Sequence, residues 1–216
     1  MTSSLITPDW PAPPNVIAGT TVRTAGDAAL PNGIRFLNQV HGADVVTADQ
    51  VRHSAEPLDA DAVSGHEGGD SCAVRTADCL PVLFCSSNGD SVAAAHAGWR
   101  GLAAGVLENT VKAMGRSPGI LMAWLGPAIS QPNFEVGEEV REAFVVHDSA
   151  AASCFEENDR GRWQADLYEL ARQRLRACGV EAIYGGGWCT FADAGRFYSY
   201  RRAADTGRMV SFVTLK

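Results

Sequence analysis

The chain has 216 residues, of which 46% are hydrophobic and 20% charged, and its formal net charge is −7. This composition is typical of one large globular domain, and the negative charge without any basic run argues against a nucleic-acid polymer or an anionic membrane as partner. Its apolar runs are much shorter than the roughly 18–20 residues that a membrane span needs.

The whole chain, 1–216, is expected to be a single domain that starts with a Pro-rich segment, 1–15, forming a tail or an edge. That segment has neither a basic start nor an apolar stretch, so it does not resemble a secretory signal, and a cytoplasmic location is expected. The six cysteines include no C-x-x-C pair, which favours buried or ligating thiols over disulfides.

Short runs of β-branched and aromatic residues, separated by Gly, Asp and Asn, predict strands. In chain order these runs are 34–40, 43–47, 71–76, 80–85, 91–95, 120–125, 181–184, 196–200 and 209–215. Apolar stripes predict helices at 100–114 and 136–146, and a third helix follows the capping-box pattern of Asp166 and Glu169, with Gly179 at its end. Strands outnumber helices without regular alternation, which favours an α+β layered sandwich.

Three strand-like runs end in a residue that can bind a metal, set among small residues: His41, Cys79 and His96. Loops at strand ends are where a rigid scaffold presents functional groups. Two imidazoles and one thiolate suit zinc better than magnesium or calcium, and three protein ligands leave a fourth position open for water or substrate. The long spacings are equally compatible with histidines that are merely hydrogen-bonded structural residues.

The segment from His96 to Gly101 passes from a strand through two glycines into the 100–114 helix. The free N–H groups of the first turn and the guanidinium of Arg100 favour an anion there, although an ordinary tight strand–helix connection has the same sequence. Asp78 is expected to orient an imidazole, to relay a proton or to cap a turn. Arg201 and Arg202 offer further cations beside the aromatic residues at 197–200, and Arg75 precedes Cys79 by four residues.

Five blocks of the sequence resemble the YfiH-type laccase-domain family and occur in that family's order. They are NQVHGADV (38–45), RTADCLPVLF (75–84), AAAHAGWRGLAAGVLENTV (93–111), LGPAISQPNFEVGEEV (125–140) and FYSYRR (197–202). The resemblance implies mixed β-sheets packed in layers and flanked by helices. It also implies purine nucleoside phosphorylase activity, with adenosine deaminase and methylthioadenosine phosphorylase activity in the same site.

The family's metal-binding and catalytic residues match His41, Cys79 and His96, with zinc as the expected metal and copper as the other candidate. Nucleoside and phosphate are the expected small-molecule partners. The residues expected to bind them are Asn38, Arg75, Asp78, Arg100, Tyr200 and Arg201. After Arg201 and Arg202 the family often has an acidic residue, whereas this chain has Ala203 and Ala204, so a role for an acid there stays open.

Three other functions remain open at this point. One is a copper-dependent polyphenol oxidoreductase, the family's earlier label, although a multi-copper centre needs more histidines than the five present. Another is a metal-free cysteine hydrolase with Cys79 as nucleophile and His96 or His41 as base, acting on an amide such as a cell-wall precursor. The last is a binding module without catalysis.

Overall fold

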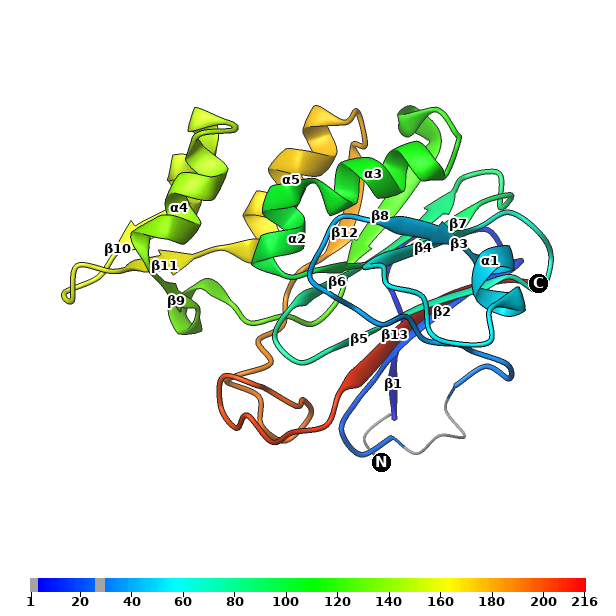
Figure 1. The fold of residues 1–216 in the computed structure, drawn as a ribbon, viewed down its shortest axis with the longest axis horizontal. Coiled ribbons are helices and arrows are strands. Elements are labelled where there is room, and N and C mark those ends of the chain that lie inside the picture. Colours follow the sequence, from blue (N-terminus) through cyan, green and yellow to red (C-terminus); the bar gives the residue numbers. More distant parts are fainter. Residues whose placement is uncertain (1–3, 26–29) are drawn as a thin grey trace.

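The structure, a computed structural model, describes residues 4–25 and 30–216. At its centre lies a six-stranded mixed sheet (Figure 1). Its order is β12 (Ala182–Gly185), β8 (Leu121–Leu125), β6 (Leu80–Ser86), β7 (Val92–Ala97), β4 (Ala62–Gly65) and β3 (Val45–Thr47). The two edge strands run parallel to their neighbours and the inner pairs are antiparallel. The six-stranded sheet therefore has the mixed character expected for the family.

A second sheet, of four antiparallel strands, packs on one face of the first. Its order is β1 (Leu5–Ile6), β2 (Val16–Thr21), β13 (Met209–Leu215) and β5 (Ser71–Thr76). Leu83, Cys85 and Trp124 of the first sheet share a buried core with Val74 and Val213 of the second. Strand β1, from the Pro-rich N-terminal segment, lies at an edge of this second sheet.

Helices α2 (Trp99–Ala104), α3 (Val106–Ala113) and α5 (Leu167–Ala177) cover the opposite face of the six-stranded sheet (Figure 1). Strand β6 is apolar from Leu80 to Cys85 because it is buried on both sides. Its Val82 and Phe84 belong to the helix-side core, whereas Leu83 and Cys85 belong to the core between the sheets, as the alternation of strand side chains requires.

The remaining elements lie at the two ends of the molecule. A three-stranded antiparallel sheet in the order β10 (Phe155–Glu157), β11 (Trp163–Ala165), β9 (Glu135–Val136) extends to one side together with α4 (Glu138–Val145) (Figure 1). Helix α1 (Ala48–His53) follows β3 at the other end and starts with a capping box between Thr47 and Gln50. Short 3₁₀ helices in the described chain include η2 (Pro118–Ile120), η3 (Gln131–Asn133) and η4 (Ser149–Cys154).

The predicted α+β layered sandwich is confirmed, but two predicted strands are wrong. Segment 34–40 makes only one isolated bridge, between Asn38 and Asp59. Its polar groups make individual hydrogen bonds to backbone and side-chain groups and do not form a continuous strand ladder. The Val40 N–H donates to the Asp61 carboxylate, and the Gln39 amide exchanges two hydrogen bonds with the backbone of Arg75.

Segment 196–200, the other wrong prediction, is irregular for a similar reason. The Tyr198 N–H donates to Met209 Sδ, and the Ser199 hydroxyl donates to the Asp78 carboxylate. Phe197 is fully buried in a small core with Val22 and Met209. The aromatic composition that suggested a strand thus reflects burial without strand pairing.

The predicted helix 100–114 is two helices, divided at Gly105. This glycine has a φ of 95°, a left-handed conformation that ends α2 and begins α3. Leu102, Val106 and Val111 nevertheless all pack into the helix-side core, so the apolar stripe continues across the break. In the part of the chain that the structure describes, no helix is both long enough and apolar enough for a membrane span.

Candidate metal centre and substrate pocket

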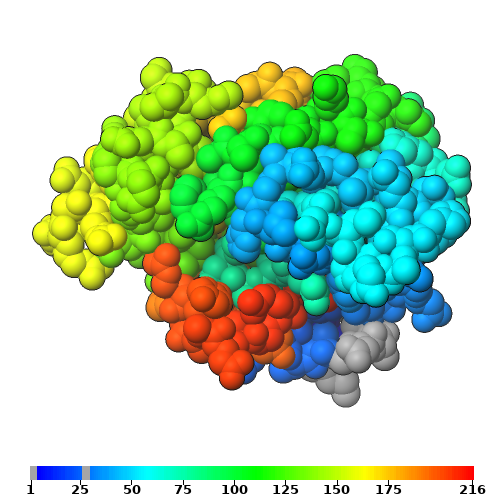
Figure 2. All heavy atoms as spheres, in the orientation of Figure 1, coloured from blue at the N-terminus to red at the C-terminus, as the bar shows by residue number. Residues whose placement is uncertain are grey.

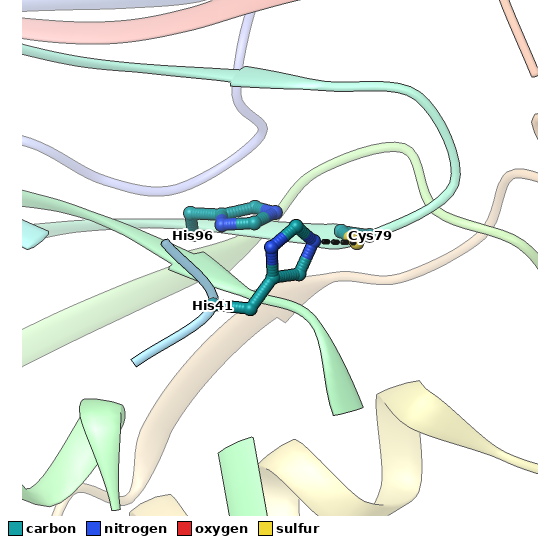
Figure 3. Close-up of side chains that lie close together, drawn as sticks. All are labelled: His41, Cys79 and His96. Atoms are coloured by element: carbon teal, nitrogen blue, oxygen red, sulfur yellow. Dashed lines mark hydrogen bonds between the residues drawn. The ribbon is translucent and has the colours of Figure 1, made fainter. Parts of the chain in front are cut away.

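Three side chains from separate segments meet at one point (Figure 3). The potential ligand atoms of His41, Cys79 and His96 all lie within 4.8 Å of one another, and Cys79 Sγ is 4.0 Å from His41 Nε2. The two imidazole rings meet edge to face, with 4.8 Å between their centroids. Within residues 4–25 and 30–216, no other cluster of three or more histidine, cysteine, aspartate or glutamate side chains has a geometry that could hold a metal ion.

The β6–β7 register brings Cys79 and His96 together. Leu80 pairs with Ala97 and Pro81 pairs with His96, so Cys79 lies beside the end of β7. Asp78, just before Cys79, adopts a left-handed φ of 89° that turns the chain between β5 and β6. His41 comes from the irregular segment before β3 and also has a positive φ, 61°, which is uncommon for a residue other than glycine.

Asp61, which the sequence analysis did not single out, forms hydrogen bonds with the ring of His96 and the backbone of His41. Its fully buried carboxylate lies 2.7 Å from His96 Nδ1 and accepts backbone hydrogen bonds from His41 at 3.0 Å and Gly42 at 2.7 Å. Because Nδ1 of His96 is engaged, Nε2 is the ring atom left to face a metal. The same carboxylate thereby stabilises the unusual backbone conformation of His41.

The electrostatics of the group favour a thiolate at Cys79. Burial alone would raise the pKa of Cys79, but hydrogen bonds with His41 and His96 and their positive charges bring the pKa down to about 6. Burial alone would lower the pKa of His96, but hydrogen bonds with Asp61 and Cys79 and their negative charges raise it to about 9. Metal ligands of these types bind after losing their protons, so a thiolate is already prepared to bind.

Two glycines allow the start of α2 to approach this group closely. A Cβ atom at Gly98 would lie 2.9 Å from Cys79 Sγ and 3.2 Å from a ring carbon of His41. A Cβ atom at Gly101 would lie 2.6 Å from the carbonyl oxygen of Gly42. The glycines of the His96–Gly101 segment are therefore explained by close packing around the three side chains.

The donor set and its spacing fit a tetrahedral metal. Zinc–nitrogen and zinc–sulfur bonds of about 2.0–2.3 Å place neighbouring ligand atoms roughly 3.3–3.8 Å apart. The observed separations of up to 4.8 Å need only a small contraction to reach those values. Three protein ligands would leave one position facing the pocket.

The three side chains line a pocket of about 810 Å³. Figure 2 shows the surface hollowed where the blue segment before β3, the green start of α2 and the red segment before β13 meet. All the residues predicted to contact substrate line this same pocket: Asn38, Arg75, Asp78, Arg100, Tyr200 and Arg201. The structure thus brings together residues that are distant in the sequence.

The pocket is rich in positive charge although the chain is acidic. Its lining includes four arginines, Arg75, Arg100, Arg201 and Arg208. The first three lie over the rings of Phe36, Trp99 and Phe134, at 5.0, 4.4 and 5.5 Å from the ring centroids. None of the four forms an ion pair with a described residue. Unpaired guanidinium groups around a pocket favour an anionic ligand.

Asp78 lines the pocket but does not orient an imidazole in the described structure. Its carboxylate accepts hydrogen bonds from the Thr190 hydroxyl at 2.6 Å, the Ser199 hydroxyl at 3.0 Å and the Arg201 N–H at 2.7 Å. These contacts attach the segment before β13 to the turn that carries Cys79. Of the roles that the sequence left open, the turn role agrees with this geometry, and Asp61 contacts the imidazole of His96 instead.

The aromatic residues at 197–200 are divided between the core and the pocket. Phe197 is fully buried and the Tyr198 hydroxyl donates to the Arg23 carbonyl, so neither is placed to stack on a ligand. Tyr200 lines the pocket and is 57% exposed. Trp99 and Phe134 are further pocket aromatics.

Several pocket residues were missed by the sequence analysis. They are Gln39, Thr76, Ala77, Trp99, Ile129, Phe134, Thr206 and Arg208. Gln39 and Trp99 adjoin the quoted histidine and arginine motifs, so proximity in sequence could have indicated them. Arg208 carries no local signal, because only the pairing of β13 with β5 brings it to the pocket.

The sequence resembles several known proteins along most of its length. The family model described as multi-copper polyphenol oxidoreductase laccase matches residues 13–216. A protein of Pseudomonas aeruginosa named purine nucleoside phosphorylase is 48% identical, with 98% of each chain covered. A protein of Escherichia coli named purine nucleoside phosphorylase YfiH is 43% identical, with 99% of each chain covered.

Solved structures show the same fold. A Neisseria meningitidis protein superposes with a TM-score of 0.94 at 43% identity, covering 99% of this chain and all of its own. YlmD from Geobacillus stearothermophilus superposes with a TM-score of 0.87 at 25% identity, covering 100% of this chain and 97% of its own.

Proposed function

The chain belongs to the laccase-domain family described as multi-copper polyphenol oxidoreductase laccase, and from that membership we propose that it is a metal-dependent purine nucleoside phosphorylase. The observation that carries the proposal is the pocket, in which a His/Cys/His group able to hold a metal lies among arginines without carboxylate partners in the described chain. A phosphorylase needs a site for an inorganic anion beside a site for a purine, and this lining offers both kinds of contact.

Zinc is the proposed metal. Two imidazoles and one thiolate form a donor set typical of catalytic zinc, with His41, Cys79 and His96 as its ligands. Asp61 supports the assignment because a carboxylate on the second nitrogen of a ligating histidine fixes the ring and its tautomer. When bound, zinc supplies Lewis-acid chemistry at its fourth position.

The protein's own residues would position the two substrates. In the proposed reaction an oxygen of inorganic phosphate forms a bond to C1′ of the ribose, while the C1′–N9 bond breaks and the purine leaves with the electron pair. Arg100 is the proposed phosphate ligand, because its guanidinium has no hydrogen-bond partner among the described residues and lies over Trp99. Helix α2 has only six residues, so any anion affinity there depends mainly on Arg100 and less on the helix start.

The purine is proposed to lie against the pocket aromatics. Tyr200 and Phe134 line the pocket from two different segments. Asn38 supplies an amide and Arg201 a guanidinium nearby. We extend the proposal to deamination of adenosine and to phosphorolysis of methylthioadenosine, since both substrates present the same purine to the same lining.

A copper-dependent oxidoreductase acting on phenols is the alternative that the family description suggests. A His₂Cys group binds copper, and divalent copper exceeds zinc in affinity at most nitrogen and sulfur sites. Electron transfer through several coppers needs additional histidines in reach, however, and His53, His66 and His147 are exposed residues outside the group. A single copper would give at most slow oxidation.

A cysteine hydrolase without metal is the second alternative, favoured by one observation. Cys79 Sγ lies 4.0 Å from His41 Nε2, and its pKa of about 6 makes it a thiolate at neutral pH. A nucleophilic Cys79 would act on an amide without requiring any metal. Removal of metal therefore distinguishes this alternative from the phosphorylase.

Product analysis tests the proposed function directly. Adenosine incubated with the metal-loaded protein should give adenine and ribose 1-phosphate in amounts that rise with added phosphate, and inosine from deamination when phosphate is withheld. Inosine as substrate should give only hypoxanthine and ribose 1-phosphate. Formation of neither free base nor inosine from adenosine would reject the assignment, and rapid oxygen-consuming oxidation of phenols would favour the copper enzyme.

A further inference from the structure

The pocket carries more positive charge than the proposed reaction uses. A purine nucleoside is neutral, and the attacking phosphate is assigned to Arg100. Arg75, Arg201 and Arg208 also line the pocket, and none forms an ion pair with a residue in the described ranges. Three further guanidinium groups in a pocket lined by one carboxylate, that of Asp78, indicate a second anionic group on the substrate.

Two of these arginines are neighbours through the β5–β13 pairing. Arg75 pairs with Val210 in the β5–β13 ladder, and Arg208 lies immediately before β13, two residues before Val210. Diagonal neighbours across adjacent strands are within reach of long side chains. Arg75 and Arg208 are both exposed and both line the pocket, so together they can bind one anion.

The contacts of these arginines hold them in place and leave donors free. Arg75 lies over the Phe36 ring, and its side chain has no hydrogen-bond partner among the described residues. Arg208 donates from Nη1 to the carbonyls of Thr206 and Gly207, and Arg201 donates from Nη1 to the Glu135 carbonyl. The other N–H groups of all three guanidinium groups remain available to a ligand.

Arg75 also lines a second pocket. This pocket of about 450 Å³ shares Arg75 with the first and is lined otherwise by residues such as Phe36 and Leu58. It includes none of the three side chains of the metal centre. Arg75 therefore lines both pockets, and it is not one of the side chains of the metal centre.

We propose that Arg75 and Arg208 form a second anion subsite that binds the 5′-phosphate of a purine nucleoside 5′-monophosphate. This inference rests on the proposed phosphorylase function. The reaction would join an oxygen of inorganic phosphate to C1′ of the nucleotide and break the C1′–N9 bond. The purine takes the bonding electrons and the proton given up by the attacking hydrogen phosphate. With adenosine 5′-monophosphate the products are adenine and ribose 1,5-bisphosphate.

Binding of adenosine 5′-monophosphate and of adenosine, measured by calorimetry on the metal-loaded full chain, tests the subsite. The monophosphate should bind at least about tenfold more tightly, as charge-assisted contacts to phosphate predict. Arg208→Gln and Arg75→Gln should each remove most of this advantage. Arg162→Gln is the matched control, because Arg162 is an exposed arginine on the β10–β11 connection outside both pockets. Equal affinities for the two ligands would overturn the inference.

The Arg100→Gln variant separates the two anion positions. If the 5′-phosphate has its own subsite, the advantage of the monophosphate persists in Arg100→Gln. Loss of the advantage in this variant would mean that both anions use one position, and the second subsite would be rejected. Turnover is measured separately from binding. If the protein cleaves adenosine but does not bind the monophosphate preferentially, only the second subsite is rejected. If the protein cleaves neither substrate, the phosphorylase assignment is rejected, and the two affinities still decide whether the subsite exists.

Discussion

Asp61 and His96 are joined by two hydrogen bonds. The Asp61 carboxylate lies 2.7 Å from His96 Nδ1, and the Asp61 carbonyl accepts the backbone N–H of His96, also at 2.7 Å. The same carboxylate binds the N–H groups of His41 and Gly42. One buried side chain therefore fixes the ring of one proposed ligand and the backbone of another.

Replacing Asp61 by asparagine should weaken metal binding. Asp61→Asn keeps the size of the side chain but removes the charge that orients His96, and loss of such a carboxylate lowers metal affinity about 10–100-fold. Competition with a chromogenic chelator measures the affinity. Asp44→Asn is the control, because Asp44 is exposed and its side chain is outside this network. Unchanged affinity in folded Asp61→Asn protein would contradict the positioning role.

A methyl group at Gly98 should disturb the metal centre while leaving the backbone unstrained. Gly98 has a φ of −64°, which alanine adopts readily, but its Cβ would lie 2.9 Å from Cys79 Sγ. Gly98→Ala should therefore reduce zinc content or affinity by about tenfold or more, a change of the size found when metal surroundings are altered. Gly119→Ala, where a Cβ meets nothing within 4 Å, should retain the zinc content of the unmodified protein. Equal zinc content in both variants would refute the close packing argued for Gly98.

The thiol of Cys79 should react as a thiolate in the metal-free protein. Its pKa is lowered to about 6, so the thiolate predominates above that pH and the alkylation rate should reach half its maximum near pH 6. Burial raises the pKa of Cys85 to about 12, so Cys85 should remain unmodified throughout. Peptide mass mapping after brief iodoacetamide treatment follows each cysteine separately. A midpoint for Cys79 near the ordinary thiol value would contradict the proposed electrostatics, and zinc should protect Cys79 from reaction.

Arg100→Gln should affect phosphorolysis more than deamination. Removing a guanidinium that binds phosphate should raise the KM for phosphate about tenfold, in line with a charge-assisted hydrogen bond of roughly 1.5–3 kcal/mol. Formation of inosine without phosphate should change much less. Rates of adenine and inosine formation over a phosphate series give both values, and Arg162→Gln is the matched control. An equal loss of both activities would indicate a structural role for Arg100, through its contact with Trp99.

The layered fold was predictable because most of its strands are apolar runs that the core requires. Strands β6 and β8 are buried along their whole length, and that burial is visible in their sequences. Strand β4, Ala-Val-Ser-Gly, was missed because small residues carry little strand signal. Segment 34–40 was mistaken for a strand because the Asp61 carboxylate, twenty residues away, replaces the strand pairing that its composition suggested.

The candidate site was predictable only where it coincides with short motifs. His41, Cys79, His96 and Arg100 lie in the five blocks that resemble the family. Asp61 lies in none of them, and its contacts with His96 depend on the β4–β7 pairing, which the sequence does not reveal. Arg208 likewise reaches the pocket through β13. Tertiary pairing, which local sequence patterns do not encode, decides these positions.

The metal dependence of phosphorolysis tests the central claim most directly. Protein stripped of metal and confirmed metal-free by elemental analysis is assayed with adenosine and phosphate, then reloaded with zinc and assayed again. The metal-free protein should release no adenine, and activity should return in proportion to zinc until one ion is bound per chain. Full adenine release by the metal-free protein would contradict the proposed zinc centre of His41, Cys79 and His96.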